Sequence, residues 1–266
     1  MAINNSDKLT PKKALGQHFL HDQNIAQRIV ESLTLVPESK KVLEIGPGMG
    51  VLTQYLLANE SIDLHAVEID RDAVDYLNVH FPQMKGKIWS RDFLRMKSED
   101  LFDGQELFSI IGNLPYNISS PIFFKVLEMR DRIPQVTCMI QKEVAERIAG
   151  SHGNKTYGIL SVLMQAFYKV EYLFTVNEGV FTPPPKVKSG VIRFTRLENK
   201  EIDCDVVNFF KVVKQGFSTR RKMLRNALKC YNLSPELYNH YYMDKRAEQL
   251  TVQDFITLTN LIFPRA

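Results

Sequence analysis

The chain has 266 residues, 44% of them hydrophobic, enough to bury one substantial core and leave one small accessory domain. Its start is polar, and nowhere do about eighteen apolar residues run together, which argues against a signal peptide and a membrane span and favours a cytoplasmic location. The formal net charge of +4 favours anionic partners without identifying one.

The three cysteines, Cys138, Cys204 and Cys230, are an odd number with no close pair. This spacing argues against a disulfide framework and against a thiolate zinc site. We therefore expect plain thiols and no metal. The sequence shows no obvious stripe of residues that would favour oligomerisation, so we expect a monomer.

The first two thirds of the chain alternate between strand-like and helix-like segments. Asp22 can cap a helix whose apolar residues recur at helical spacing up to Leu33. Strand-like runs cover 41–46, 63–70, 87–92, 107–113 and 135–141, with helix-like segments at 51–58, 71–81 and 121–129 between them. Strands joined by helix-length crossovers predict an α/β fold with a doubly wound, largely parallel sheet. Ligands of such sheets bind at the carboxyl ends of the strands.

A last strand-like run covers 189–198, and 203–262 is helical in pattern, with breaks near Ser234–Pro235 and Asp244. We place a boundary near residue 200. The sequence thus predicts a larger α/β domain at 1–200 and a small helical domain at 201–266.

Glycines follow the first of these strands in "EIGPGMG", at Gly46, Gly48 and Gly50. Missing side chains there let a ligand approach the backbone and the N-terminus of the next helix. A dinucleotide fingerprint requires its third glycine one place later, where this chain has Val51. The departure disfavours NAD and favours another ligand that carries adenosine.

Acidic residues end the next two strands. Glu68 can accept hydrogen bonds from both hydroxyls of a ribose, and Asp92 can accept from an adenine amino group, with Phe93 beside the ring. Taken singly, each feature is equally well explained by a tight turn, a solvated carboxylate or a helix cap. Together they predict a site for S-adenosylmethionine.

The stretch "GNLPY" ends the fourth strand. Pro115 fixes its own φ and makes Leu114 extended, so the Leu114 carbonyl and the Asn113 amide oxygen are predicted to converge on one point. Such a pair can bind both N–H groups of an exocyclic amine such as adenine N6, while Tyr116 lies on the face of the base. The alternative is a plain exit from a strand with Tyr116 packed in the core.

The chain resembles the ribosomal small-subunit RNA adenine dimethyltransferases. The resemblance spans essentially the whole sequence and rests on "LGQHFL", "EIGPGMG", "VEID", "RDFL", "GNLPYNISSPI", "FTPPPKVKSGVIRF" and "GFSTRRKMLRNALK", in that order. It implies a Rossmann-like sheet dependent on S-adenosylmethionine. It also implies transfer of four methyl groups to N6 of two adjacent adenosines in the 3′-terminal hairpin loop of the 16S (small-subunit) rRNA, with a role in small-subunit biogenesis.

The same resemblance assigns residues to roles. The cofactor positions are His18, Leu20, Gly46, Glu68, Asp92 and Asn113, to which the glycine turn adds Gly48, and the target-base pocket is formed by Asn113, Leu114, Pro115, Tyr116 and Phe181. His18 stands where the family often has asparagine, and either residue can donate a hydrogen bond. Phe181 begins "FTPPPKV", so its ring is expected to clamp the extruded base opposite Tyr116; the alternative is that it caps the core.

Basic residues gather in 217–229. A continuous helix there would place Phe217, Leu224 and Leu228 on one face and Arg221, Arg225 and Lys229 in an adjoining row, with Arg220 and Lys222 beside it. We expect this row to bind RNA, although a merely solvated face has the same pattern. Lys12, Lys13, Lys186 and Lys188 flank the expected pocket and could contact phosphate.

Three other functions are open on the sequence alone. A resistance-type methyltransferase of large-subunit RNA shares the pocket chemistry, but the basic segment and complete helical tail favour the small subunit. A DNA adenine methyltransferase is expected to have Pro-Pro where this chain has Leu114–Pro115. A noncatalytic ribosome-assembly factor could keep the fold without keeping Asn113, Tyr116 and the carboxylates together.

Overall fold

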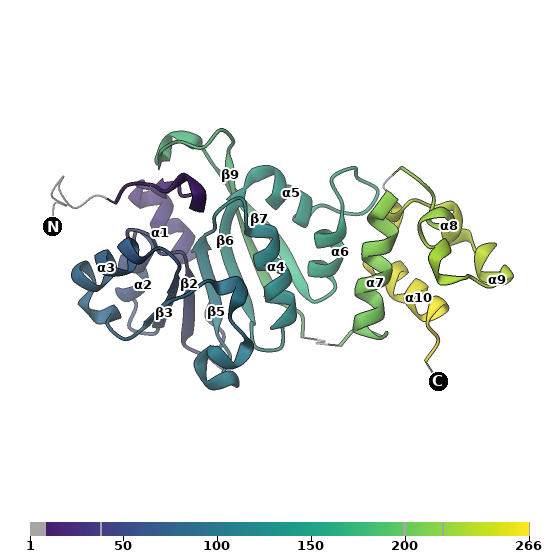
Figure 1. Cartoon of the computed structure of the whole chain (residues 1–266), viewed down its shortest axis with the longest axis horizontal. Helices are drawn as coiled ribbons and strands as arrows, with labels where there is room; N and C mark the ends of the chain where they lie inside the picture. The colour runs from purple at the N-terminus through teal and green to yellow at the C-terminus, as the bar shows by residue number, and fades with distance from the viewer. Residues whose placement is uncertain (1–8, 38, 199–200, 220, 266) are drawn as a thin grey trace. The chain divides into compact units, whose positions relative to one another are not determined.

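The computed structural model describes residues 9–37, 39–198, 201–219 and 221–265. The chain forms two compact units, Met1–Ala145 with Glu171–Thr195, and Glu146–Val170 with Arg196–Ala266 (Figure 1). The chain enters the second unit for the last time at residue 196, near the boundary expected at 200. Residues 146–170, which the sequence placed in the first domain, belong to the second unit.

A seven-stranded sheet forms the centre of the first unit, in the order β4-β3-β2-β5-β6-β9-β7. Its strands are β2 (Lys41–Ile45), β3 (Asp63–Glu68), β4 (Ile88–Ser90), β5 (Ser109–Asn113), β6 (Gln135–Gln141), β7 (Tyr168–Val176) and β9 (Ser189–Arg196). β2 is parallel to β3 and β5, β4 to β3, and β6 to β5, whereas β9 is antiparallel to β6. The predicted parallel α/β sheet is confirmed.

Helices cover both faces of this sheet, which explains why the central strands β2, β5 and β6 are buried along nearly their whole length rather than at alternate residues. On one face, α1 (Gln23–Glu31) and α2 (Thr53–Leu57) pack against residues such as Val42 and Leu64. On the other, α4 (Ser119–Glu128) packs Phe123 against Phe194 of β9, with 5.1 Å between the ring centres. α3 (Arg71–His80) joins β3 to β4.

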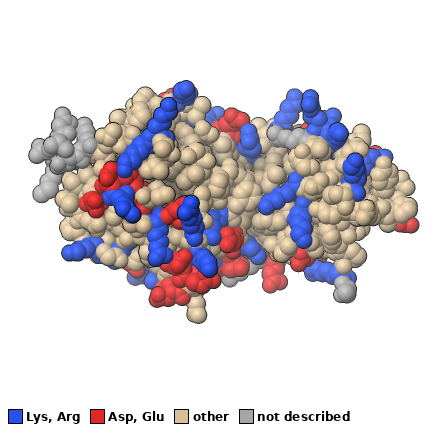
Figure 2. All heavy atoms as spheres, viewed as in Figure 1, with Lys and Arg blue, Asp and Glu red and all other residues tan. Residues whose placement is uncertain are grey.

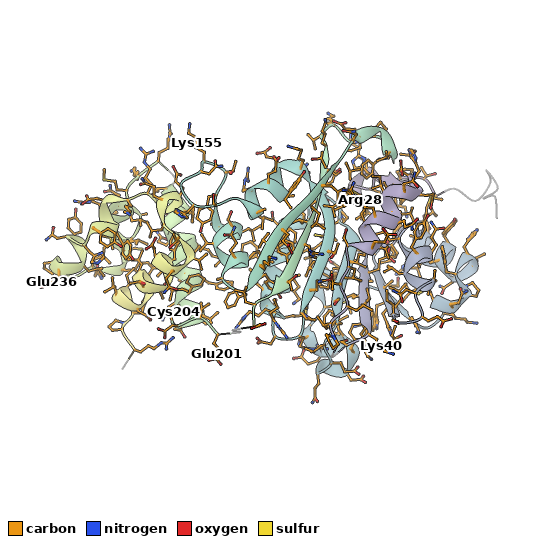
Figure 3. All side chains as sticks on the ribbon, turned by 180° about the vertical axis from the view of Figure 1, so that it is seen from behind. Arg28, Lys40, Lys155, Glu201, Cys204 and Glu236 are labelled. Carbon is orange, nitrogen blue, oxygen red and sulfur yellow. The ribbon has the colours of Figure 1, made fainter. Side chains whose placement is uncertain are left out.

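The expected N-cap of α1 is confirmed, because Asp22 Oδ1 accepts from the Ile25 N–H at 3.0 Å. Further along α1, the guanidinium of Arg28, which is labelled in Figure 3, lies 3.7 Å from the centre of the Phe174 ring. Phe174 belongs to β7, a strand that the sequence patterns did not predict. α1 thus bridges the two halves of the sheet.

A small two-stranded sheet was also not foreseen. β1 (Phe19–Leu20) pairs antiparallel with β8 (Phe181–Thr182), with Leu20 opposite Phe181. Its two strands come from distant segments of the chain. The pairing brings the N-terminal motif "LGQHFL" beside the motif "FTPPPKV".

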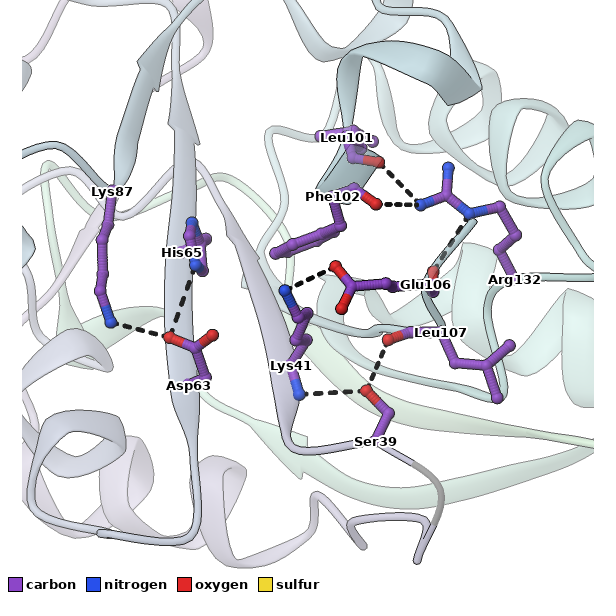
Figure 4. A network of polar contacts seen from close by, with 10 residues as sticks. All are labelled: Ser39, Lys41, Asp63, His65, Lys87, Leu101, Phe102, Glu106, Leu107 and Arg132. Atoms are coloured by element: carbon purple, nitrogen blue, oxygen red, sulfur yellow. Dashed lines mark hydrogen bonds and ion pairs between the residues drawn. The ribbon is translucent and has the colours of Figure 1, made fainter. Parts of the chain in front are cut away.

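A polar network lies at the amino ends of the strands (Figure 4). Arg132 donates to the backbone carbonyls of Leu101 (2.7 Å) and Glu106 (3.1 Å), and so holds the connection between β4 and β5. His65 of β3 stacks on Trp89, and burial lowers the pKa of its imidazole. These contacts stabilise the end of the sheet opposite the one where ligands are expected.

In the second unit, α6 (Ile159–Gln165), α7 (Val206–Gly216) and α10 (Val252–Ile262) pack around a small core. Its centre contains Phe209, Phe217 and Phe255, and the rings of the last two are stacked with centres 5.8 Å apart. The helical character predicted for the C-terminal region is confirmed. No described helix is long and apolar enough to cross a membrane.

The prediction of a continuous basic helix over 217–229 is wrong. The segment forms the 3-10 helix η8 (Phe217–Thr219), a turn, the short α8 (Leu224–Ala227) and the 3-10 helix η9 (Lys229–Tyr231). Met223 is extended, and the Leu224 N–H donates to the Lys245 carbonyl at 2.8 Å rather than to the preceding turn. This long-range hydrogen bond replaces helix continuation, so no row of basic residues at four-residue spacing exists there.

Candidate active site

A pocket of about 240 Å³ opens at the carboxyl ends of β2, β3 and β5. The strand ends supply Glu68 and Asn113, and the segment after β4 supplies Asp92. The predicted residues that line the pocket are His18, Leu20, Gly46, Gly48, Glu68, Asp92, Asn113, Leu114, Pro115 and Tyr116. The structure therefore brings together all the predicted cofactor and base-pocket positions except Phe181, as expected where parallel strands end at one edge.

The turn after β2 keeps its backbone open to the pocket. Gly46 has φ of 66°, which side-chain-bearing residues rarely adopt, and a Cβ built there would meet nothing within 4 Å. Gly48 also has a positive φ, and its Cβ would lie 3.0 Å from the Phe19 ring. The free space above Gly46 is where a ligand could lie against the backbone.

Two of the predicted carboxylates line the same pocket. Glu68 is 5% exposed and accepts from the N–H groups of Gly48 (3.2 Å) and Asp70 (2.9 Å); burial raises its pKa, and these hydrogen bonds oppose the rise. Asp92 lines the pocket and also caps a short 3-10 helix by accepting from the Leu94 N–H at 3.0 Å. The cap that the sequence left as an alternative is therefore present together with the pocket position.

The N-terminal segment Ala14–Leu20 forms one wall of the pocket, a wider stretch than the two positions taken from the sequence. Asp70 fastens it to the start of α3, because its carboxylate accepts from Lys12 Nζ and, at 2.9 Å, from Gln17 Nε2. Burial pushes the pKa of Asp70 up, but these hydrogen bonds outweigh it and hold the pKa below its usual value. Asp70 and Gln17 were missed, since neither residue type nor spacing linked them.

Glu44 was also missed. It lies within β2, is 1% exposed, lines the pocket and accepts from Thr53 Oγ1 at 2.7 Å. Burial raises the pKa of Glu44 to about 8. A signal was present in the sequence, because a carboxylate inside the apolar run "KVLEIG" is out of place in a buried strand.

Asn113 is held by the N-terminal wall. Its Nδ2 donates to the His18 carbonyl at 3.0 Å, so its Oδ1 is the end of the amide left to accept. The Leu114 N–H donates to the Met139 carbonyl at 3.0 Å, and no N–H in the described part of the chain donates to the Leu114 carbonyl. Two oxygens at this strand end thus remain available as acceptors.

Tyr116 is fixed from two sides. Its hydroxyl lies 2.6 Å from the Oγ of Ser189, which is fully buried at the start of β9, and its ring stacks on His18 with centres 5.6 Å apart. His18 Nδ1 donates to the Pro183 carbonyl at 2.8 Å. Burial raises the pKa of Tyr116, so the phenol keeps its proton. The ring is therefore a fixed, neutral surface.

Phe181 does not line the pocket. Its side chain is 3% exposed and belongs to the hydrophobic core around α1 and β2, with Leu20 as its strand partner. This placement matches the alternative that Phe181 caps the core. A clamping role requires the ring to leave that core, and it stays a prediction.

The predicted RNA-binding residues lie in the second unit. Arg221, Lys222 and Lys229 are exposed and form no ion pair within the described ranges, whereas Arg220 lies outside them. Arg225 is different, because it pairs with Asp244 and lies 5.3 Å from the centre of the Tyr238 ring. Figure 2 shows Lys and Arg side chains standing out from this part of the surface. Three of the five positions are thus available to an anion.

A family model described as "Ribosomal RNA adenine dimethylase" matches residues 8–263. The chain belongs to this family. Ribosomal RNA small subunit methyltransferase A of Cytophaga hutchinsonii is 58% identical over 256 residues, covering 96% of this chain and 98% of that protein. The protein of the same name from Porphyromonas gingivalis is 49% identical over 258 residues, with coverage of 96% and 98%.

Solved structures agree with this membership. A dimethyladenosine transferase from Plasmodium falciparum matches with a TM-score of 0.75 and 25% identity, covering 91% of this chain and 96% of that one. The 23S rRNA methyltransferase ErmE has a TM-score of 0.65 at 24% identity, with coverage of 91% and 99%, and shows the shared fold. The family, the Rossmann-like methyltransferase fold and S-adenosylmethionine as methyl donor are therefore confirmed.

The residues of this dimethylase fit S-adenosylmethionine. The open space over Gly46 admits a ligand against the backbone, and Glu68 offers a buried carboxylate at the end of β3, where ribose hydroxyls are bound in such sheets. Asp92 and the wall that contains His18 and Leu20 complete the enclosure. Among the described residues, no cluster of three or more His, Cys, Asp or Glu side chains could hold a metal ion.

Proposed function

We propose that the chain transfers four methyl groups from S-adenosylmethionine to N6 of two adjacent adenosines in the 3′-terminal hairpin loop of small-subunit rRNA. The observation that carries the proposal is the orientation of the Asn113 amide. Its NH₂ group donates to the His18 carbonyl in the wall of the cofactor pocket, which leaves its oxygen free to accept. The names of the two relatives reported above support the small subunit as the substrate.

In this proposal, Asn113 Oδ1 and the Leu114 carbonyl accept the two N–H groups of the target amine. Binding both donors draws the nitrogen lone pair out of conjugation with the ring, and acceptors already in position need little reorganisation in the transition state. S-adenosylmethionine supplies an electrophilic methyl group when bound. No strong general base is needed, because the methylated cationic amine is acidic enough to lose its proton to water.

Tyr116 holds the extruded base. A target inside an RNA stack must leave it before a side chain can reach N6, and an aromatic face replaces part of the lost stacking. The bond to Ser189 and the contact with His18 keep the Tyr116 ring in one orientation. Positioning of the amine therefore supplies most of the acceleration in this mechanism.

Binding to the subunit is assigned to the C-terminal region. Residues 201–266, as a helical RNA-binding domain, carry Arg221, Lys222 and Lys229 as exposed cations for rRNA phosphate. The enzyme acts as a monomer on the small subunit or its precursor. Its cytoplasmic location follows, within this proposal, from the site of ribosome assembly.

The test is transfer of labelled methyl groups to undermethylated small subunits, with the modified bases mapped. Transfer to two adjacent adenosines of the 3′-terminal hairpin is expected. Modification of large-subunit RNA instead would identify a resistance-type enzyme, and binding without transfer would identify an assembly factor.

Asn113→Ala should lower turnover at least about a hundredfold while subunit affinity stays within a few-fold, because the acceptor acts in the transition state. Asn78→Ala, on the exposed face of α3, is the matched control and should leave both unchanged. Equal losses of turnover and affinity in Asn113→Ala would contradict the assignment of Asn113.

A further inference from the structure

The segment between β8 and β9 is braced at both ends. At its start, the Pro183 carbonyl accepts from His18 Nδ1 at 2.8 Å, and at its end the Lys188 carbonyl accepts from the Lys142 N–H at 2.9 Å. Pro185, between them, is buried. A segment fixed at three points presents the residues of its tip in a defined place.

The tip, Lys186–Val187–Lys188, is exposed. Val187 is 44% exposed, and the flanking lysines form no ion pair in the part of the chain that the structure describes. The run from Phe181 to Lys188 contains no acidic residue. A β-branched apolar side chain between two free cations matches a partner that offers both a flat apolar face and negative charge, which is the chemistry of a nucleic acid strand.

The tip stands next to the surface proposed for the target base. Ser189, directly after it, bonds the Tyr116 hydroxyl at 2.6 Å, and His18, which holds its start, stacks on the Tyr116 ring. The strand that carries an extruded base must pass close to this ring. When a base leaves its stack, the face of its neighbour is exposed to water unless an apolar side chain covers it.

We propose that this tip is an RNA-contact site, in which Val187 packs against the base beside the extruded adenosine and Lys186 and Lys188 bind the adjoining phosphates. The proposal rests on the proposed function and adds to it the contact that holds the neighbouring nucleotide. It explains why an exposed apolar residue stands between two lysines just before Ser189, the residue that bonds Tyr116.

The first test compares Val187→Ser with Val79→Ser, a valine of α3 in the same unit that is 73% exposed. In methyl transfer to undermethylated small subunits, Val187→Ser should lower kcat/KM about tenfold, which is the size of effect expected when a valine side chain is no longer buried against a base. Val79→Ser should behave as the wild type. A wild-type kcat/KM in Val187→Ser would overturn the apolar contact.

The second test does not depend on turnover. A benzophenone side chain placed at position 187, and at position 79 as the control, is photo-crosslinked to the bound subunit, and the crosslinked nucleotides are mapped. We expect crosslinks beside the target adenosines from position 187 and none from position 79. Absence of these crosslinks would overturn the proposed RNA contact at the tip, even if methyl transfer is normal. Crosslinks at this place without any methyl transfer would overturn the proposed function and leave the contact site standing.

The lysines are tested by the salt dependence of subunit binding. Lys186→Gln with Lys188→Gln should lower the slope of log affinity against log salt by about one for each lysine. An unchanged slope would remove both from the contact.

Discussion

The hydroxyl of Tyr116 and the Oγ of Ser189 form a bond that joins the turn after β5 to the start of β9. Because Ser189 is fully buried, its position is set by the sheet and not by solvent. The bond therefore transmits the rigidity of β9 to the ring on which the target base is proposed to stack. Ser189 is a positioning residue in this arrangement, since it acts through Tyr116.

Removing this hydroxyl should loosen the ring without unfolding the sheet. Ser189→Ala is expected to lower kcat several-fold, with cofactor affinity unchanged, since one neutral hydrogen bond contributes about 1 kcal/mol. Tyr116→Phe should show a similar fall, and the double variant should fall no further, because both changes break the same bond. Methyl transfer and cofactor titration on the four proteins check this.

Ser109→Ala is the matched control. Ser109 is as buried as Ser189 and lies in β5, but its Oγ has no hydrogen-bond partner. Its replacement should leave kcat unchanged. Additive losses in the double variant, or an equal loss in Ser109→Ala, would show that Ser189 acts only through general packing.

The site residues that the sequence patterns alone revealed share one property, which is that each ends or follows a strand marked by a hydrophobic run. Glu68 and Asn113 could be found in this way. Ser189 could not, because its partner lies 73 residues away, and Gln17 is 53 residues from Asp70. Such pairs depend on tertiary packing, which single-sequence patterns do not contain.

At the scale of elements, β2 carries a carboxyl group inside an otherwise apolar strand. Glu44 has one hydrogen bond from Thr53, and burial raises its pKa to about 8, from about 4.5 in an unfolded chain. A carboxyl group whose pKa is raised by folding adds stability that is complete below pH 4.5 and is lost as the pH rises to about 8. Ionisation of Glu44 therefore lowers the stability of the folded protein as the pH approaches neutrality.

Glu44→Gln should remove this pH-dependent loss of stability, because the glutamine amide has nearly the shape of the glutamate side chain and does not ionise. The stability of the variant relative to the wild type is expected to rise by about 1 kcal/mol for each pH unit between 5 and 8. Urea unfolding followed by the fluorescence of Trp89, the single tryptophan, reports on β4 of the same sheet.

Glu60→Gln, an exposed glutamate beyond α2, is the control and should leave the pH dependence unchanged. If Glu44→Gln follows the wild type at every pH, then Glu44 is ionised in the folded protein and the buried-acid interpretation is wrong.

Elements with strong local signals were predictable, and those decided by long-range contacts were not. β6 was expected and found over 135–141, because six of its seven residues are buried. In the basic segment, the three residues predicted to form an apolar face, Phe217, Leu224 and Leu228, are all buried. Its helix is interrupted because the Leu224 N–H bonds to the Lys245 carbonyl, a partner that spacing did not indicate.

At the scale of the whole molecule, the chemistry and the expected affinity for RNA lie in different units. The pocket is formed by residues of the first unit, and the exposed cations Arg221, Lys222 and Lys229 belong to the second. Arg225 is set apart from them, because its pairing with Asp244 holds α8 to the 3-10 helix η10 (Tyr241–Asp244). Substitutions for testing RNA binding should therefore leave Arg225 in place.

Replacing Arg221, Lys222 and Lys229 with glutamine should weaken subunit binding and lower the slope of log affinity against log salt by about one for each phosphate that is no longer neutralised. Turnover at saturating subunit concentration should change little, since the pocket is untouched. A control with the same change in net charge replaces Lys40, Lys85 and Lys97, which are exposed in the first unit. Equal loss of affinity in both variants would mean that net charge, and not this surface, determines binding.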